Sequence, residues 1–349
     1  MRVFHDTGLD EILKITEDRG YGISIAVAQG DAIDTYCAGS GRFRRDFPVN
    51  PDMLFQAGSV SKPMFALTLL RYVDKGLIDL DADLSDTLSD LVDSPLTFPA
   101  ILSHTAGFNV HGFPGYRATH RELTLEDVIL GRGNTPKVKQ TMPYGQQVSY
   151  SGGGITLAEL AFTRLTEMTL RDAFEKEVAV PLGLHRSGYF QPLDESLIPN
   201  AAFGGKLGIW ENRKHGYHYY PEHAAAGFWT TPEELVKIGV AISRSVREGG
   251  LLSQKTAERM VTPVLQNAGL CIFRDDNIPD YAGHGGWNEG FLTSWGFSLA
   301  EDLCVAVMIN RSSKSGSKIL AELGSTLFLR ASTEYSEEIG RDTKKGISV

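Results

Sequence analysis

The sequence has little of what marks a disulfide-stabilised, membrane or nucleic-acid-binding protein. It holds only three cysteines, Cys37, Cys271 and Cys304, in 349 residues. An odd number at such wide spacing forms neither a disulfide framework nor a zinc-binding pattern. No apolar run reaches the roughly 18 residues that a membrane-spanning helix needs, so we expect no membrane partner. The net charge of −9 argues against binding to nucleic acid or to an anionic membrane surface.

The first residues also lack a targeting segment. Met1 to Asp6 contain no apolar stretch of signal-peptide length, so the sequence predicts a cytoplasmic protein. An exported form that had already lost its signal peptide would have the same sequence, and this alternative stays open. Apolar residues make up 42% of the chain and charged residues 22%, as in ordinary globular proteins, so we expect a sizeable hydrophobic core.

Strand patterns occur near both ends of the chain. Two apolar runs, residues 22–28 and 32–38, flank a Gly-Asp turn and predict a hairpin. Residues 290–300 and 303–309 are apolar, β-branched and aromatic, and they predict a second pair of strands. Between them the chain has helical patterns and loops. This layout predicts an α+β fold, in which strands from both chain ends form one antiparallel sheet flanked by helices.

The same layout predicts a single unit of two lobes. The α/β lobe comprises residues 1–78 and 260–335, an all-helical lobe comprises residues 79–259, and a charged tail occupies residues 336–349. Clefts between lobes are favoured ligand sites. The clearest helix start is at Thr231, whose hydroxyl can cap a helix that begins with proline. Helices are predicted at residues 9–19, 125–130, 156–168, 170–178, 232–246 and 319–329.

A serine and a lysine three residues apart lie where the first strands pass into the helical middle. In a helix, Ser59 and Lys62 share one face, about one turn apart. A serine hydroxyl needs a nearby base to act as a nucleophile, and lysine can be that base only if its pKa falls. Such pairs are common by coincidence, and Pro63 lacks the N–H of a regular helix, so this pair alone does not establish a site.

Two further stretches place polar side chains beside glycines. Tyr150 lies just before the three glycines 152–154, where backbone can approach a substrate closely, and its phenol could act as a base near an ammonium. His284 precedes Gly285 and Gly286, where an extended backbone could present an N–H to a developing oxyanion. Taken singly, each stretch is better explained as a loop with a packing or surface side chain.

Taken together and in this order, the three stretches resemble motifs of the penicillin-recognising serine hydrolases. The likeness is greatest to the branch with class C β-lactamases, D-specific peptidases and amidases, and esterases. The family's S-x-x-K element matches Ser59 and Lys62, its Tyr-x-Asn element matches residues 150–152, and its K-T-G element matches residues 284–286. Residues 102–107, Leu-Ser-His-Thr-Ala-Gly, are similar to a further family signature.

The resemblance covers roughly residues 10–330 and implies a β-lactamase/transpeptidase-like fold. It implies that Ser59 is the acylating nucleophile and that Lys62 and Tyr150 transfer protons, with Tyr150 as the expected general base. The backbone N–H groups of Ser59 and Trp287 would form the oxyanion hole. It implies no cofactor and no metal, and a small ester, amide or peptide as the partner; the oligomeric state stays open.

Two positions depart from the family pattern where a β-lactam would be recognised. Gly152 replaces the asparagine that orients the substrate amide, and His284 replaces the lysine that holds its carboxylate. We assign Gly152, His284, Gly285 and Gly286 to substrate binding and expect esters, small amides or peptides as substrates. The alternatives are a true class C-type β-lactamase and a catalytically silent penicillin-binding or scaffold member of the fold.

Four other histidines need an interpretation. His104, within the signature stretch, is expected to be a buried structural residue. His215, His218 and His223 lie in an aromatic loop and could in principle bind zinc, but they lack the helical spacing of a zinc-binding motif. We therefore expect no metal there and interpret the loop as a rim of the substrate cleft.

Overall fold

The computed structural model describes most of the chain between residues 21 and 332. The described residues are 21–42, 45–117, 123–204, 216–313 and 323–332, together with Ser317 and Leu320. The helix predicted at 9–19 and the predicted charged tail lie outside them.

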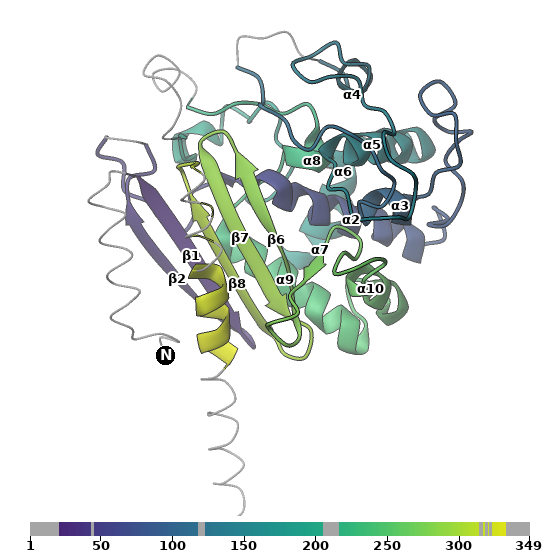
Figure 1. The fold of residues 1–349 in the computed structure, drawn as a ribbon. Helices are drawn as coiled ribbons and strands as arrows, with labels where there is room; N and C mark the ends of the chain where they lie inside the picture. Colours follow the sequence, from purple (N-terminus) through teal and green to yellow (C-terminus); the bar gives the residue numbers. More distant parts are fainter. Residues whose placement is uncertain are drawn as a thin grey trace, which may run out of the picture.

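One antiparallel sheet of six strands forms the centre of the described structure (Figure 1). Its strands are β1 (Gly22–Gln29), β2 (Ala32–Gly39), β5 (Phe273–Arg274), β6 (Tyr281–Asn288), β7 (Phe291–Ser298) and β8 (Leu303–Ile309). They lie in the order β2-β1-β8-β7-β6-β5, so the first strand pairs with the last, and Ile23 lies opposite Ile309. This pairing confirms the predicted α+β fold, with one sheet built from both chain ends.

Helices cover both faces of this sheet (Figure 1). On one face lies α9 (Pro232–Glu248), where the Trp295 indole N–H of β7 donates to the Leu235 carbonyl at 2.9 Å. On the other face, the helical residues 323–332 pack apolar side chains against β1 and β8. α9 therefore packs against the sheet, whereas the sequence analysis placed this helix in the all-helical lobe of residues 79–259. The two-lobe division itself stays a prediction.

The long helix α2 (Ser61–Asp74) runs through the hydrophobic core. Every residue from Ser61 to Leu70 is buried, which explains the apolar positions that recur along this segment. The chain also forms the short segments β3 (Phe55–Gln56), which pairs with β4 (Trp229–Thr230), and the 3-10 turns η1 (Gly58–Val60) and η3 (Ile198–Asn200). The other helices are α3 (Phe98–Leu102), α4 (Leu125–Ile129), α5 (Gly152–Thr166), α6 (Leu170–Phe174), the π-helical η2 (Glu175–Ala179), α7 (Val180–Leu182), α8 (His223–Ala226) and α10 (Gln254–Val261).

Capping residues explain where the helices begin. The Thr231 side chain accepts from the Glu234 N–H, as predicted for the start of α9. The Ser151 side chain accepts from the Gly154 N–H, so α5 begins at Gly152 and not at the predicted Thr156. The three glycines form its first turn. Glycine is needed there because a side chain at Gly153 would lie 2.9 Å from Val138.

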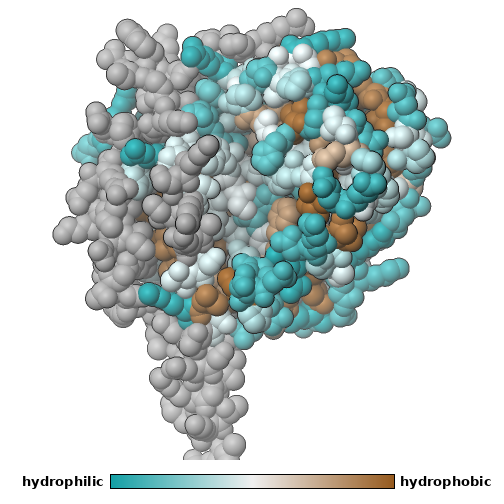
Figure 2. Space-filling model, in the orientation of Figure 1, coloured by the Kyte–Doolittle hydropathy of each residue, from teal (hydrophilic) through white to brown (hydrophobic). Residues whose placement is uncertain are grey.

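The described residues in view form no broad apolar area. Figure 2 shows that hydrophobic residues on this face form small patches separated by hydrophilic ones. Within the described ranges, no helix has the length and apolar character needed to cross a membrane. The three cysteines are unpaired thiols.

Candidate active site

The chain turns sharply into α2 and brings Ser59 beside Lys62. Gly58 has a φ of +55°, in the left-handed region that glycine adopts without strain. The turn η1 follows, and the Lys62 ammonium donates to Ser59 Oγ at 2.9 Å. Pro63 lies in the first turn of α2, where a backbone N–H is not needed for the helix, so it does not disturb this arrangement.

Lys62 is buried without a carboxylate among its hydrogen-bond partners. Its side chain is 2% exposed, and Nζ donates to Ser59 Oγ and to the Ala225 carbonyl of α8 at 2.7 Å. Burial disfavours the charged form and lowers the pKa of Lys62 to about 7. Neutral and protonated lysine are therefore both populated near neutral pH.

The Tyr150 ring lies next to Lys62. Its centroid is 5.0 Å from Lys62 Nζ. Burial raises the pKa of Tyr150, and the nearby Ser59 hydroxyl opposes this with a smaller effect. The two hydroxyls do not reach hydrogen-bonding geometry, and Tyr150 Oη has no hydrogen-bond partner within the described part of the chain. Tyr150 is thus a protonated phenol at neutral pH.

The backbone of strand β6 lies close to the backbone of η1, the turn that carries Ser59. β5 pairs only with residues 282–283 of β6, so beyond them this edge has no strand neighbour in the described structure. A side chain at Gly58 would lie 2.6 Å from Trp287 N, and one at Gly286 would collide with the Ala57 carbonyl. These contacts bring the backbone of Trp287 close to Ser59, as an oxyanion hole requires.

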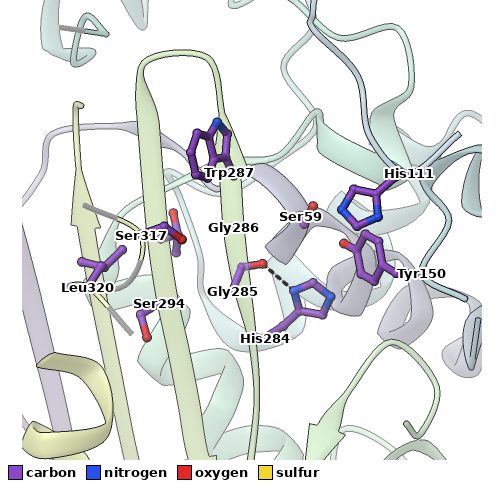
Figure 3. Close-up of a pocket in the computed structure, with 11 residues that line it drawn as sticks. Ser59, His111, Tyr150, His284, Gly285, Gly286, Trp287, Ser294, Ser317 and Leu320 are labelled. Atoms are coloured by element: carbon purple, nitrogen blue, oxygen red, sulfur yellow. Dashed lines mark hydrogen bonds between the residues drawn. The ribbon is translucent and has the colours of Figure 1, made fainter. Parts of the chain in front are cut away.

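His284 lies on β6 and is 7% exposed. Its Nδ1 is 2.6 Å from the Gly285 carbonyl, which can only accept, so Nδ1 carries the proton and Nε2 has a free lone pair. Burial, together with Lys62, lowers the pKa of His284 to about 3, so the ring is neutral. Nε2 has no partner among the described residues, and Figure 3 shows the ring directed toward Tyr150.

These groups meet in a pocket of about 290 Å³ (Figure 3). None of the described residues that line it is an aspartate, glutamate, lysine or arginine. The pocket therefore presents hydroxyl, imidazole, indole and backbone groups to a ligand. The lining residues are Ser59, His111, Tyr150, His284, Gly285, Gly286, Trp287, Thr293, Ser294, Ser317 and Leu320.

One predicted binding residue lies elsewhere. Gly152 is buried in the first turn of α5 and does not line the pocket, and a side chain there would meet the Phe113 ring at 2.8 Å. Phe113 therefore occupies space beside the position of the family's asparagine. A role for Gly152 in substrate binding stays a prediction.

Several lining residues were not singled out from the sequence. His111 contacts the Tyr150 ring at a centroid distance of 4.9 Å, but it stands in a loop without a recognisable motif. Thr293 and Ser294 are polar residues within the largely buried β7, and this interruption was the one signal available. Ser317 and Leu320 approach from the C-terminal segment, far away in the sequence.

The histidine-rich loop does not form a metal cluster in the described residues. His215 lies outside them. His218 Nδ1 is 2.9 Å from the Pro114 carbonyl, whereas His223 Nδ1 is 3.5 Å from Glu159. No group of three or more histidine, cysteine or acidic side chains in the described ranges could hold a metal ion.

Comparison with known proteins agrees with this geometry. Residues 12–324 match the family model Beta-lactamase. The acyltransferase calJ of Penicillium decumbens is 30% identical over 125 residues, which are 30% of this chain and 28% of that protein. The esterase EstB of Burkholderia gladioli is 25% identical over 181 residues, 48% of this chain and 46% of EstB. The matched segments thus span less than half the length of these curated relatives.

The fold is shared with solved structures. The D-amino acid amidase from Ochrobactrum anthropi SV3, solved with D-phenylalanine, superposes with a TM-score of 0.76 at 19% identity, over 95% of this chain and 100% of that one. At this identity the likeness shows the fold alone. The family match over nearly the whole chain confirms the resemblance seen in the motifs: the chain belongs to the beta-lactamase family of penicillin-recognising serine hydrolases.

Proposed function

We propose that the protein is a serine hydrolase in which Ser59 attacks the carbonyl carbon of an ester or small amide and becomes acylated. The observation that carries this proposal is the 2.9 Å contact between Lys62 Nζ and Ser59 Oγ. Burial lowers the pKa of this lysine to about 7, so its amine is partly neutral and can accept the serine proton.

The remaining steps use the same groups. As Ser59 Oγ bonds to the carbonyl carbon, its proton passes to Lys62, and the Ser59 and Trp287 N–H groups stabilise the negative oxygen. The Lys62 ammonium then returns a proton to the alcohol or amine as its bond to the carbonyl carbon breaks. Water attacks the acyl carbonyl carbon with transfer of its proton to Lys62, and Lys62 returns this proton to Ser59 Oγ as the bond between Oγ and the acyl carbon breaks and the acid product leaves.

The environments of the two candidate bases favour Lys62 over Tyr150. The family resemblance implies Tyr150 as the base, but burial raises the pKa of this phenol. The same physical effect lowers the pKa of Lys62, because its charged form is the cation. We infer that Lys62 accepts the proton from Ser59 and that Tyr150 remains a neutral hydroxyl beside it, able to donate a hydrogen bond to the leaving group while Lys62 supplies the proton.

The pocket favours uncharged substrates over carboxylates. His284 is held neutral with a free lone pair at Nε2, so it accepts a hydrogen bond and repels a carboxylate oxygen. No cationic side chain is among the lining residues. Similarity to an esterase and a shared fold with an amidase support esters and small amides as the substrate class.

Replacement of the nucleophile tests the proposal. Ser59→Ala should abolish hydrolysis of p-nitrophenyl butyrate, whereas Ser89→Ala, at an exposed serine outside the pocket, should leave it unchanged. Undiminished turnover by Ser59→Ala would refute the proposal. Nitrocefin hydrolysis at a rate comparable to that of the ester would favour a true β-lactamase. Stable labelling by a fluorescent penicillin without any ester or amide turnover would favour a silent binding protein.

A further inference from the structure

His104 holds the backbone on both sides of Tyr150. Its carbonyl accepts from the Ser149 N–H at 2.7 Å, and its ring Nδ1 accepts from the Ser151 N–H at 3.2 Å. The two neighbours of Tyr150 in the chain are therefore hydrogen-bonded to one residue that lies more than 40 positions earlier. Both bonds are sheltered, because the His104 side chain is 2% exposed.

The imidazole also packs against the phenol itself. The His104 and Tyr150 ring centroids are 4.4 Å apart, with their planes inclined at 35°. On its own hydroxyl Tyr150 has no hydrogen-bond partner in the described residues. The position of the phenol is thus determined by its ring contacts and by the backbone that carries it, and His104 contributes to both.

The protonation state of His104 suits this task. Since the Ser151 N–H points at Nδ1, that nitrogen must keep its lone pair, and the proton of the neutral ring lies on Nε2. Burial and the nearby Lys62 cation lower the pKa of His104 well below its usual value. His104 does not line the pocket, so it has no contact with a substrate.

The backbone of His104 is unusual as well. Its φ is +59°, a left-handed conformation that few residues other than glycine adopt and in which asparagine, aspartate and histidine are enriched. Such strain persists only where the surrounding contacts require it, and it is concentrated at functional sites. Here the left-handed turn directs the carbonyl and the ring of one residue to the two N–H groups that flank Tyr150.

We propose that His104 is a positioning residue that holds the Tyr150 phenol beside Lys62 and Ser59. This inference rests on the proposed hydrolase function and extends it to a residue outside the pocket. It replaces the interpretation of His104 as a histidine that serves the stability of the fold alone.

Two substitutions distinguish the effect of the imidazole ring from the effect of the left-handed backbone at this position. His104→Gly removes the imidazole but allows the left-handed φ, whereas His104→Asn also tolerates that φ and places Oδ1 near the position of Nδ1, where it can accept from Ser151. His104→Gly should lower kcat for p-nitrophenyl butyrate about tenfold to a hundredfold with little change in KM, because a misplaced catalytic group slows the chemical step. His104→Asn should recover most of the loss, and His185→Asn, at an exposed histidine, serves as the control.

The outcomes distinguish this inference from the proposed function. Wild-type kcat in folded His104→Gly, or an equal loss in His104→Asn, would overturn the positioning role while leaving the hydrolase intact. If His104→Gly does not fold, His104→Asn decides alone, since the inference requires near wild-type kcat from it. If the wild-type protein hydrolyses no ester, the proposed function fails first. A crystal structure of the glycine variant then still tests the inference, which requires Tyr150 to be displaced by about 1 Å or more.

Discussion

At the scale of single residues, the proposed chemistry depends on two buried side chains whose pKa values move in opposite directions. The Lys62 cation loses hydration and becomes easier to deprotonate, whereas the Tyr150 anion loses hydration and becomes harder to form. The sequence could place these residues in one site through family motifs. It could not reveal which of them holds the exchangeable proton, because burial depends on residues such as Ala225 that carry no motif.

The pH dependence of catalysis tests this assignment. Lys62 must be neutral to accept the Ser59 proton, so kcat/KM for p-nitrophenyl butyrate should be low in acid and rise to a plateau with a midpoint near pH 7. Lys62→Arg, which keeps the charge at all accessible pH values, should be inactive throughout. A midpoint far above neutral pH would instead indicate that the Tyr150 anion is the base.

In the proposed function, His284 determines which substrate charges the pocket accepts. His284→Lys restores the family's cation, so it should accelerate acylation by nitrocefin about tenfold, as a charge-assisted hydrogen bond to the carboxylate predicts. The added positive charge should also shift the pH midpoint of ester hydrolysis downward, because a second cation disfavours protonated Lys62. His284→Gln has no cation and should show neither effect. Equal nitrocefin rates for the two variants would contradict this account.

At the scale of elements, the proposed oxyanion hole depends on how closely η1 approaches β6. The sequence indicated a glycine-rich stretch at residues 283–287, yet glycines are depleted in strands, so its membership of the eight-residue β6 was not evident. At two of these glycines the reason is tertiary: a side chain at Gly286 would collide with the Ala57 carbonyl just before η1, and one at Gly283 would collide with the Trp295 carbonyl of β7. The start of α5 was missed for the same reason, because helix propensity disfavours the glycines that loop packing requires.

Gly286→Ala tests the η1–β6 contact. The new methyl group would collide with the Ala57 carbonyl and push η1 away from β6, which separates the N–H groups of Ser59 and Trp287. We expect kcat to fall about a hundredfold or more, as for the loss of an oxyanion-hole donor, with a smaller effect on thermal stability. Gly112→Ala is the matched control, since nothing lies within 4 Å of its new methyl group. Similar kcat values for both variants would argue against the predicted oxyanion hole.

At the scale of the whole molecule, distant parts of the chain meet around the first and last strands. The apolar runs of β1 and β8 are buried and predicted their place in the sheet, but the buried Asn310 that joins them gave no signal in the sequence. Its side chain accepts from the Gly22 N–H at 2.6 Å and donates to the Ser40 and Phe203 carbonyls at 3.0 Å each. The location of α9 on the sheet was likewise missed. Its amphipathic pattern shows that one face of the helix is buried, but it does not show which element covers that face.

Asn310→Ala tests the importance of this junction. The substitution removes the side-chain partner of two buried backbone groups, the Gly22 N–H and the Phe203 carbonyl, and of the partly buried Ser40 carbonyl, so the free energy of unfolding should fall by about 2–4 kcal/mol. Urea denaturation measures this change, with Asn277→Ala, at an exposed asparagine, as the control. A change below about 0.5 kcal/mol, typical of surface substitutions, would show that the junction is not important for stability.

The central claim is that Ser59 carries the acyl group during turnover. Peptide mass spectrometry after rapid acid quenching of the protein with p-nitrophenyl butyrate tests it most directly. We expect a butyryl group on the peptide that contains Ser59, absent from Ser59→Ala and reduced in Lys62→Arg. A butyryl group on another residue, or ester hydrolysis by the wild-type protein that persists in Ser59→Ala, would contradict it.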